Sequence, residues 1–105
     1  MTVQPSPLYM NLLGETARIS WDELQPFFAR GALLWVAAEL DLVAVAEALA
    51  QDDRVSVAKW LEDELLAVVA APLAEDLLQR DPELWAVVVA PWVVIQERSG
   101  KPQLH

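Results

Sequence analysis

The sequence predicts an α+β fold: a small single domain in which about five helices pack on a mixed or antiparallel sheet of three to four strands. At 105 residues with 55% hydrophobic side chains, the chain can bury one core. Segments with helical periodicity and caps alternate with short apolar runs that lack it, in the order helix, helix, strand, helix, helix, strand, helix, strand, strand. We place the domain at residues 7–98, with flexible ends at 1–6 and 99–105, which are rich in Pro, Gly or polar residues.

The first helix is expected over residues 7–17. Ser6 followed by Pro7 is typical of an N-cap and a first-turn proline. Leu8 and Leu12 can share one face of this helix.

The second helix is expected to begin at Trp21, because Ser20 and Glu23 have the spacing of a capping box. Gly31 can supply the left-handed residue that ends it. Pro26 lies inside this helix, where its ring clashes with the preceding turn and one backbone hydrogen bond is lost. We therefore expect a kink or a 3₁₀ first turn.

Two short apolar runs, 32–36 and 65–69, are predicted as strands, since each is too short for a helix and is bounded by a helix or turn signal. Between them lie two predicted helices, 41–51 and 54–63, each with an Asp that can serve as its N-cap. This middle part has the element order of helix-turn-helix folds, and a winged-helix-like arrangement is an alternative for it.

The last helix is expected between Pro72 and Asp81, with Leu73, Leu77 and Leu78 directed inward. The segment that follows is dominated by Val, Ile and Trp, which is typical of strands. Because proline cannot donate to a central ladder, Pro91 leaves two alternatives. Either a tight turn joins strands 84–89 and 92–97, or one long strand bends there.

Three stretches, Leu12–Val36, Leu40–Asp53 and Leu84–Glu97, together resemble a family of short bacterial proteins called domain of unknown function 2288. The ETA-x-I-x-W and PWV-x-x-QE patterns are the most specific parts of the likeness. The resemblance implies a bacterial cytoplasmic protein and transfers no functional residues. Relatives are expected to carry a glycine-containing turn where this chain has Glu62–Leu65, which leaves that connection open.

Composition excludes several kinds of chemistry. The chain has no cysteine, its one histidine is the terminal His105, and its three glycines form neither a dinucleotide-binding nor a P-loop pattern. Its net charge of -9 disfavours nucleic acid and anionic membranes as partners. No apolar stretch is long enough to span a bilayer, and no secretory signal is evident. We expect a cytoplasmic protein without a cofactor.

The acidic residues Asp52-Asp53 and Glu62-Asp63-Glu64 could bind a metal ion, but they fit no metal-binding motif and are interpreted as solvated helix ends. The same acids argue against DNA binding by the middle part of the chain, where only Arg54 and Lys59 are basic.

Five tryptophans are many for a chain of this length. Trp35, Trp60, Trp85 and Trp92 lie in predicted strands or on an apolar helical face and are interpreted as core residues. Trp21 stands beside acids at a helix start and is expected to be partly exposed.

The leading functional hypothesis is a non-enzymatic protein-interaction or assembly module, acting through a protein partner or self-association. Apolar composition and a strand 92–97 that can present a free edge motivate it. The candidate polar surface consists of Glu15, Arg18, Trp21, Gln96 and Glu97. The alternative is a small-ligand binder or enzyme with a carboxylate and arginine pocket. A divergent helix-turn-helix DNA binder is the least favoured.

Overall fold

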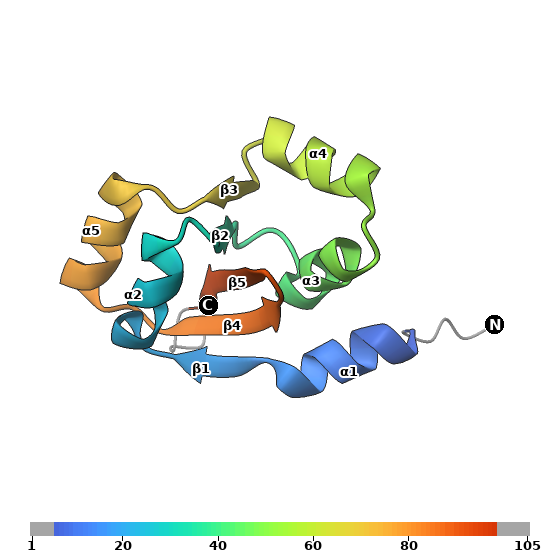
Figure 1. The fold of residues 1–105 in the computed structure, drawn as a ribbon, viewed down its shortest axis with the longest axis horizontal. Coiled ribbons are helices and arrows are strands. Elements are labelled where there is room, and N and C mark those ends of the chain that lie inside the picture. Colours follow the sequence, from blue (N-terminus) through green and yellow to red (C-terminus); the bar gives the residue numbers. More distant parts are fainter. Residues whose placement is uncertain (1–5, 99–105) are drawn as a thin grey trace, which may run out of the picture.

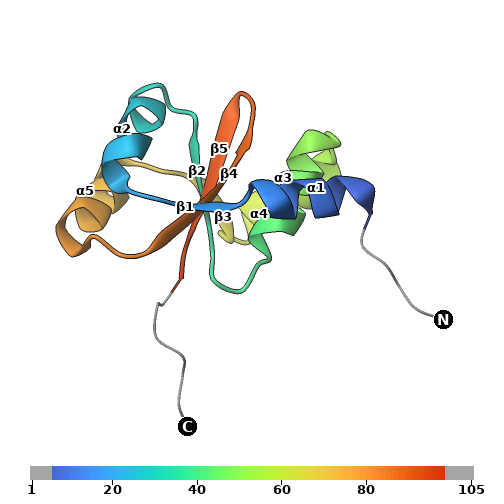
Figure 2. The same cartoon turned by 90° about the horizontal axis from the view of Figure 1, so that it is seen from below.

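A five-stranded mixed sheet separates two layers of helices in the computed structural model, which describes residues 6–98 (Figures 1 and 2). In chain order the elements are α1 (Pro7–Glu15), β1 (Ala17–Ile19), α2 (Trp21–Ala29), β2 (Leu33–Val36), α3 (Leu42–Ala50), α4 (Arg54–Glu62), β3 (Leu66–Val68), α5 (Ala71–Arg80), β4 (Leu84–Val89) and β5 (Trp92–Glu97).

The strands are ordered β1-β4-β5-β2-β3. β5 pairs with β2 in parallel, and the other three pairings are antiparallel. β4 and β5 form a hairpin whose register runs from Leu84 opposite Glu97 to Val89 opposite Trp92. Its turn contains a cis peptide bond between Ala90 and Pro91. The hairpin alternative is therefore the one that the chain adopts.

Alternate strand residues supply two separate cores, one on each face of the sheet. α1, α3 and α4 cover one face, and α2 and α5 cover the other, as Figure 2 shows with the sheet seen nearly edge-on. In β5, for example, Val94 enters the first core, whereas Val93 and Ile95 enter the second. A side-chain period of two divides the apolar residues in this way.

The predicted α+β class, five helices and mixed sheet are confirmed. The sheet has five strands, one more than the predicted upper limit, because β1 forms where the first helix was expected to end. The prediction that strand 92–97 lies at an edge is wrong: β5 is central, and the edges are β1 and β3. β3 pairs with β2 and leads into α5, so it is not followed by the second strand of a wing.

The predicted caps at the start of the first two helices are present. The Ser6 side chain accepts a hydrogen bond from the Tyr9 N–H, and Ser20 and Glu23 form the capping box. Apart from Ser6, the predicted flexible ends lie outside the described residues. α2 is α-helical through Pro26, with an i to i+3 bond from Glu23 N–H to the Ser20 carbonyl in its first turn.

Three helices end in the same way, with a left-handed residue whose own N–H, together with the N–H of the residue that follows it, donates back to carbonyls of the last helical turn. Gly31, Asp52 and Glu64 hold these positions, with φ of 71°, 56° and 62°. After α4, for example, the Leu65 N–H donates to the Trp60 carbonyl and the Glu64 N–H to the Leu61 carbonyl. Glu64 therefore occupies the helix-to-strand connection with a backbone conformation that glycine adopts more easily.

The candidate site is an apolar groove between α2 and α5

The five residues of the predicted polar surface do not form one continuous surface. Glu15 is exposed at the end of α1, and Arg18 is exposed on β1, where its guanidinium lies 3.8 Å from the Glu83 carboxylate. Trp21 and Gln96 are buried, each with 5% of its surface exposed, and they lie on opposite faces of the sheet.

Gln96 holds the connection between β2 and α3. Its Nε2 donates to the Ala37 carbonyl at 2.8 Å and to the Leu40 carbonyl at 2.7 Å. One side-chain amide therefore donates to two backbone carbonyls of this loop. Gln96 is the glutamine of the PWV-x-x-QE pattern, and this structural contact accounts for a polar residue at that position.

Glu97 belongs to an ion network that joins β5 to α5. The Arg80 guanidinium donates to both carboxylate oxygens of Glu97, at 3.0 and 2.9 Å, and to both of Asp76, at 2.8 and 2.7 Å. Hydrogen bonds from Arg80 lower the pKa of Glu97 and of Asp76, while the two carboxylates raise the pKa of Arg80. The network links the end of α5 to β5 at the surface.

The tryptophan expectations are partly reversed. Trp35, Trp60, Trp85 and Trp92 pack against the two cores as predicted, although each is only partly buried. Trp21, expected to be partly exposed, is the most buried of the five and lies 5.7 Å from Phe28, centroid to centroid. Although its backbone starts a helix among acids, its side chain turns inward between α2 and α5.

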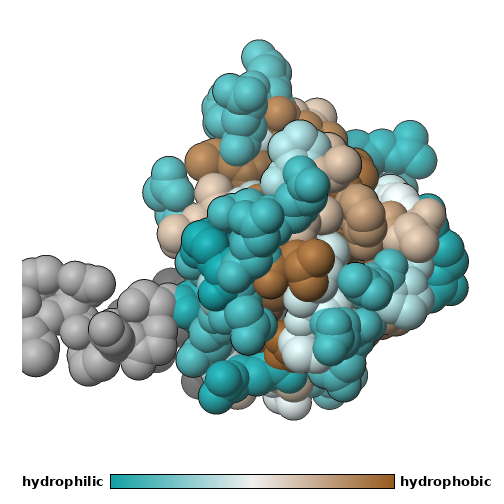
Figure 3. Space-filling model, turned by 90° about the vertical axis from the view of Figure 1, so that its left-hand side faces the viewer, coloured by the Kyte–Doolittle hydropathy of each residue, from teal (hydrophilic) through white to brown (hydrophobic). Residues whose placement is uncertain are grey.

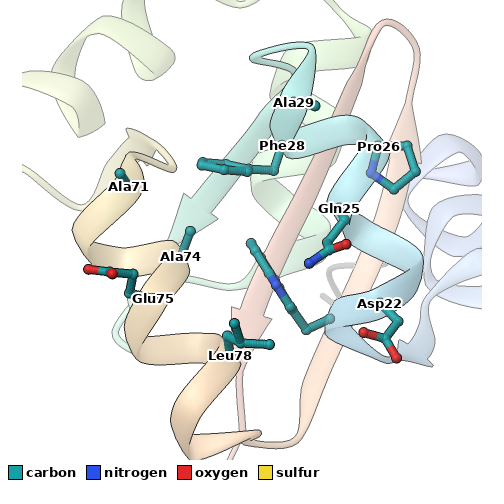
Figure 4. Close-up of a pocket in the computed structure, with 10 residues that line it drawn as sticks. Asp22, Gln25, Pro26, Phe28, Ala29, Ala71, Ala74, Glu75 and Leu78 are labelled. Carbon is teal, nitrogen blue, oxygen red and sulfur yellow. The ribbon is translucent and has the colours of Figure 1, made fainter.

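Trp21 forms part of the wall of an open groove of about 600 Å³ between the two helices. Figure 4 shows Phe28 directed from α2 toward α5, with Ala74 of α5 near it and Leu78 one turn further along α5, directed toward the start of α2. The lining residues are Trp21, Asp22, Gln25, Pro26, Phe28 and Ala29 of α2 and Ala71, Ala74, Glu75 and Leu78 of α5. Figure 3 shows this face of the molecule, where apolar residues come to the surface between bands of hydrophilic ones.

The groove exists because small side chains stand where two helices approach each other. Ala71 and Ala74 of α5 are too short to fill the space opposite Phe28. Leu77 is fully buried beneath, whereas Leu78, predicted to point inward with it, is 55% exposed. Leu78 is rotated by about 100° around the helix axis from Leu77, and it lines the groove instead of the core.

The charged residues that line the groove are acidic. Asp22 stands on α2 and Glu75 on α5, on opposite sides of the opening in Figure 4. Gln25 directs its amide toward the groove from the α2 wall. The site thus combines an apolar interior with a negative rim.

Comparison with known families identifies the chain. The model of the family described as protein of unknown function DUF2288 matches residues 7–97. The chain belongs to this family. It is also similar to PA1075 from Pseudomonas aeruginosa, known from an NMR solution structure, at 68% identity with a TM-score of 0.81, covering 100% of this chain and 97% of that one. A comparison with curated proteins finds no match.

A second hollow of this DUF2288 protein is polar. It has a volume of about 500 Å³ and is lined by Arg18, Ile19, Ser20, Glu23, Asp81, Pro82, Glu83 and Leu84. Most of its ionic groups already have partners: Glu23 belongs to the capping box of α2, and Glu83 accepts from the Trp85 indole N–H at 2.9 Å and pairs with Arg18. No described cavity brings Glu15, Arg18 and Trp21 together.

Neither a cluster of metal-binding side chains nor a membrane-spanning helix is found in the described part of this DUF2288 protein. Within residues 6–98, no three His, Cys, Asp or Glu side chains are grouped so that they could hold a metal ion. No helix in the same range is both long and apolar enough to cross a bilayer.

Proposed function

We propose that this DUF2288 protein is a non-enzymatic interaction module of the bacterial cytoplasm, and that the groove between α2 and α5 binds an apolar segment of a partner protein. The observation that carries the proposal is Leu78, a large apolar side chain left 55% exposed beside Trp21 and Phe28 in a preformed groove. Exposed apolar surface of this kind, with a polar rim, is typical of protein-binding sites.

The charge of the chain favours a different protein over a second copy or nucleic acid. Two copies would each bring a net charge of -9, and phosphate backbones would meet the same repulsion. A partner protein without this acidic excess would not be repelled by the charge of the chain.

The alternative of a small-ligand site at the polar hollow has less support. Its arginine and two of its carboxylates are engaged in contacts within the protein. A ligand there would have to break these polar contacts. A ligand in the apolar groove would break no hydrogen bond or ion pair of the apolar side chains.

The test is a titration of the ¹⁵N-labelled protein with a 15-residue helical peptide that carries a leucine stripe and uncharged polar residues elsewhere. We expect amide shifts confined to α2 and α5. Leu78→Ser should weaken binding about tenfold, the cost of losing most of one leucine contact. Val55→Ser, which changes an apolar residue that is 81% exposed on α4, is the matched control and should leave affinity unchanged. Shifts elsewhere, or equal effects of the two variants, would contradict the proposal.

A further inference from the structure

We infer that the segment bound in the groove is a short basic amphipathic helix. This inference rests on the proposed function and adds to it the conformation and the charge of the partner. Both follow from what the walls of the groove offer to an incoming chain.

The walls favour a helix over an extended peptide. Both sides of the groove are helices, α2 and α5, so neither wall presents the row of unpaired N–H and C=O groups that a strand edge would offer. The sheet edges, β1 and β3, contribute no residue to the lining. An extended peptide would therefore find no strand to pair with and would leave its own backbone groups unpaired, whereas a helix pairs them internally. Its apolar residues at i, i+3, i+4 and i+7 can reach between Phe28 and Leu78.

The charges around the groove favour a basic partner. The α2 and α5 segments and the residues that end them carry five carboxylates, on Asp22, Glu23, Glu75, Asp76 and Asp81. Their two cations are engaged elsewhere: Arg80 binds Asp76 and Glu97, and the Arg30 guanidinium lies 4.9 Å from the centre of the Phe27 ring. Asp22 and Glu75 thus meet an incoming helix from opposite sides without a basic neighbour in the lining.

Pro26 adds a hydrogen-bond acceptor to the same wall. Because proline has no N–H, the Asp22 carbonyl four residues earlier lacks the donor that an α-helix normally supplies. Asp22 and Pro26 both line the groove. Lys and Arg side chains of a partner helix can donate to this carbonyl and to the carboxylate of the same residue.

The experiment compares three peptides that share one leucine stripe and carry Lys and Arg, Gln, or Glu at the remaining positions. We expect affinity to fall in that order, and the affinity of the basic peptide alone to drop with added salt. The double variant Asp22→Asn/Glu75→Gln should weaken the basic peptide roughly fivefold and leave the uncharged peptide unaffected. Glu39→Gln/Glu62→Gln removes the same charge away from the groove and is the control.

The outcomes separate this inference from the proposed function. If the uncharged peptide binds at α2 and α5 but charge makes no difference, the basic partner is excluded and the interaction module stands. An equal effect of the control pair would also exclude it, because net charge alone would then explain the preference. A basic peptide with a central proline should not bind, and equal binding would exclude the helix. If no peptide perturbs α2 and α5, both proposals fail.

Discussion

The hydrophobic cores on the two faces of the sheet contain equal numbers of buried residues but are covered by helices in different ways. Each core contains ten buried residues. On one face, α3 alone supplies four of them, Leu42, Val43, Val45 and Ala46, and it covers β4 and β5 directly. On the other face, α2 and α5 supply two each.

This difference shows that the groove is not a consequence of a small core. On the first face, α3 lies directly against β4 and β5, and the hollow beside it, mainly between α3 and α4, has a volume of about 290 Å³. On the second face, two helices with alanines between them leave a groove of about 600 Å³. Cores with the same number of buried residues therefore accompany a small hollow on one face and a larger open groove on the other.

Mutations that create a cavity in each core are expected to give the largest difference in stability between the two faces. Leu42 and Leu77 are both 0% exposed, one in each core. We expect Leu42→Ala to lower the free energy of unfolding by about 4 kcal/mol and Leu77→Ala by about 2–3 kcal/mol, because the cost falls when the surroundings can collapse into the cavity. α5 borders an open groove and can move, whereas α3 is enclosed. Urea unfolding measures both, and a cost for Leu77→Ala equal to or above that for Leu42→Ala would show that the two faces are equally rigid.

The next test concerns the buried side-chain amide of Gln96, on the face that α3 covers. Gln96→Leu should cost about 2–3 kcal/mol, because the carbonyls of Ala37 and Leu40 would lose their donor in a buried setting. Gln79→Leu, at an exposed position of α5, should change stability by less than about 0.5 kcal/mol. Chemical denaturation of the two variants makes the comparison. A neutral effect of Gln96→Leu would mean that water replaces the amide and that the β2–α3 connection is not enclosed.

Much of the fold could be predicted because its signals are local. The caps at Ser6 and Ser20 and the left-handed Gly31 depend on a few neighbouring residues. At Pro91 the local signal left a hairpin and one bent strand as alternatives, and the pairing of β4 with β5 decides for the hairpin. β1 could not be predicted in this way, since three residues around the polar Arg18 show no pattern of their own. They become a strand only by pairing with β4, which is about 65 residues further along the chain.

The candidate site was harder to predict than the fold. Ala71, Ala74 and Leu78 have helical spacing in the sequence, but their spacing does not show how far α5 lies from α2. The central position of β5 and the burial of Trp21 likewise depend on strand order, which is a property of contacts between distant segments. Polar residues in the recognisable patterns, such as Gln96, drew attention to surface function although they pair with the backbone.

The left-handed helix ends provide a smaller and purely conformational test, one on each side of the sheet. Gly31 ends α2, and an added Cβ would meet no atom within 4 Å, so Gly31→Ala should cost about 1–2 kcal/mol through backbone conformation alone. Glu64 ends α4 in the same geometry. Glu64→Gly should therefore stabilise the protein by about 0.5–1 kcal/mol. This gain is smaller than the cost of Gly31→Ala, because a glycine loses more backbone entropy on folding than a glutamate does. Thermal and urea unfolding should shift in opposite directions for the two variants, and destabilisation by Glu64→Gly would contradict the conformational argument.

The smallest expected effect concerns the ion network that holds α5 beside the groove. Arg80 lowers the folded-state pKa of Glu97 and of Asp76, so both carboxylates bind protons less readily in the folded chain than in the unfolded one. Their contribution is present above the unfolded pKa values, about 4 for such groups, and is lost as the pH falls through the lower folded values. The unfolding free energy should therefore decline as the solution is acidified below about pH 5, and Arg80→Gln should make that decline shallower. Arg54→Gln, which breaks a more exposed pair with Asp52 on the other layer, should leave the slope unchanged. Equal slopes for the wild-type chain and Arg80→Gln would show that α5 is held by Leu77 and the core alone, and the groove width would then be independent of the network.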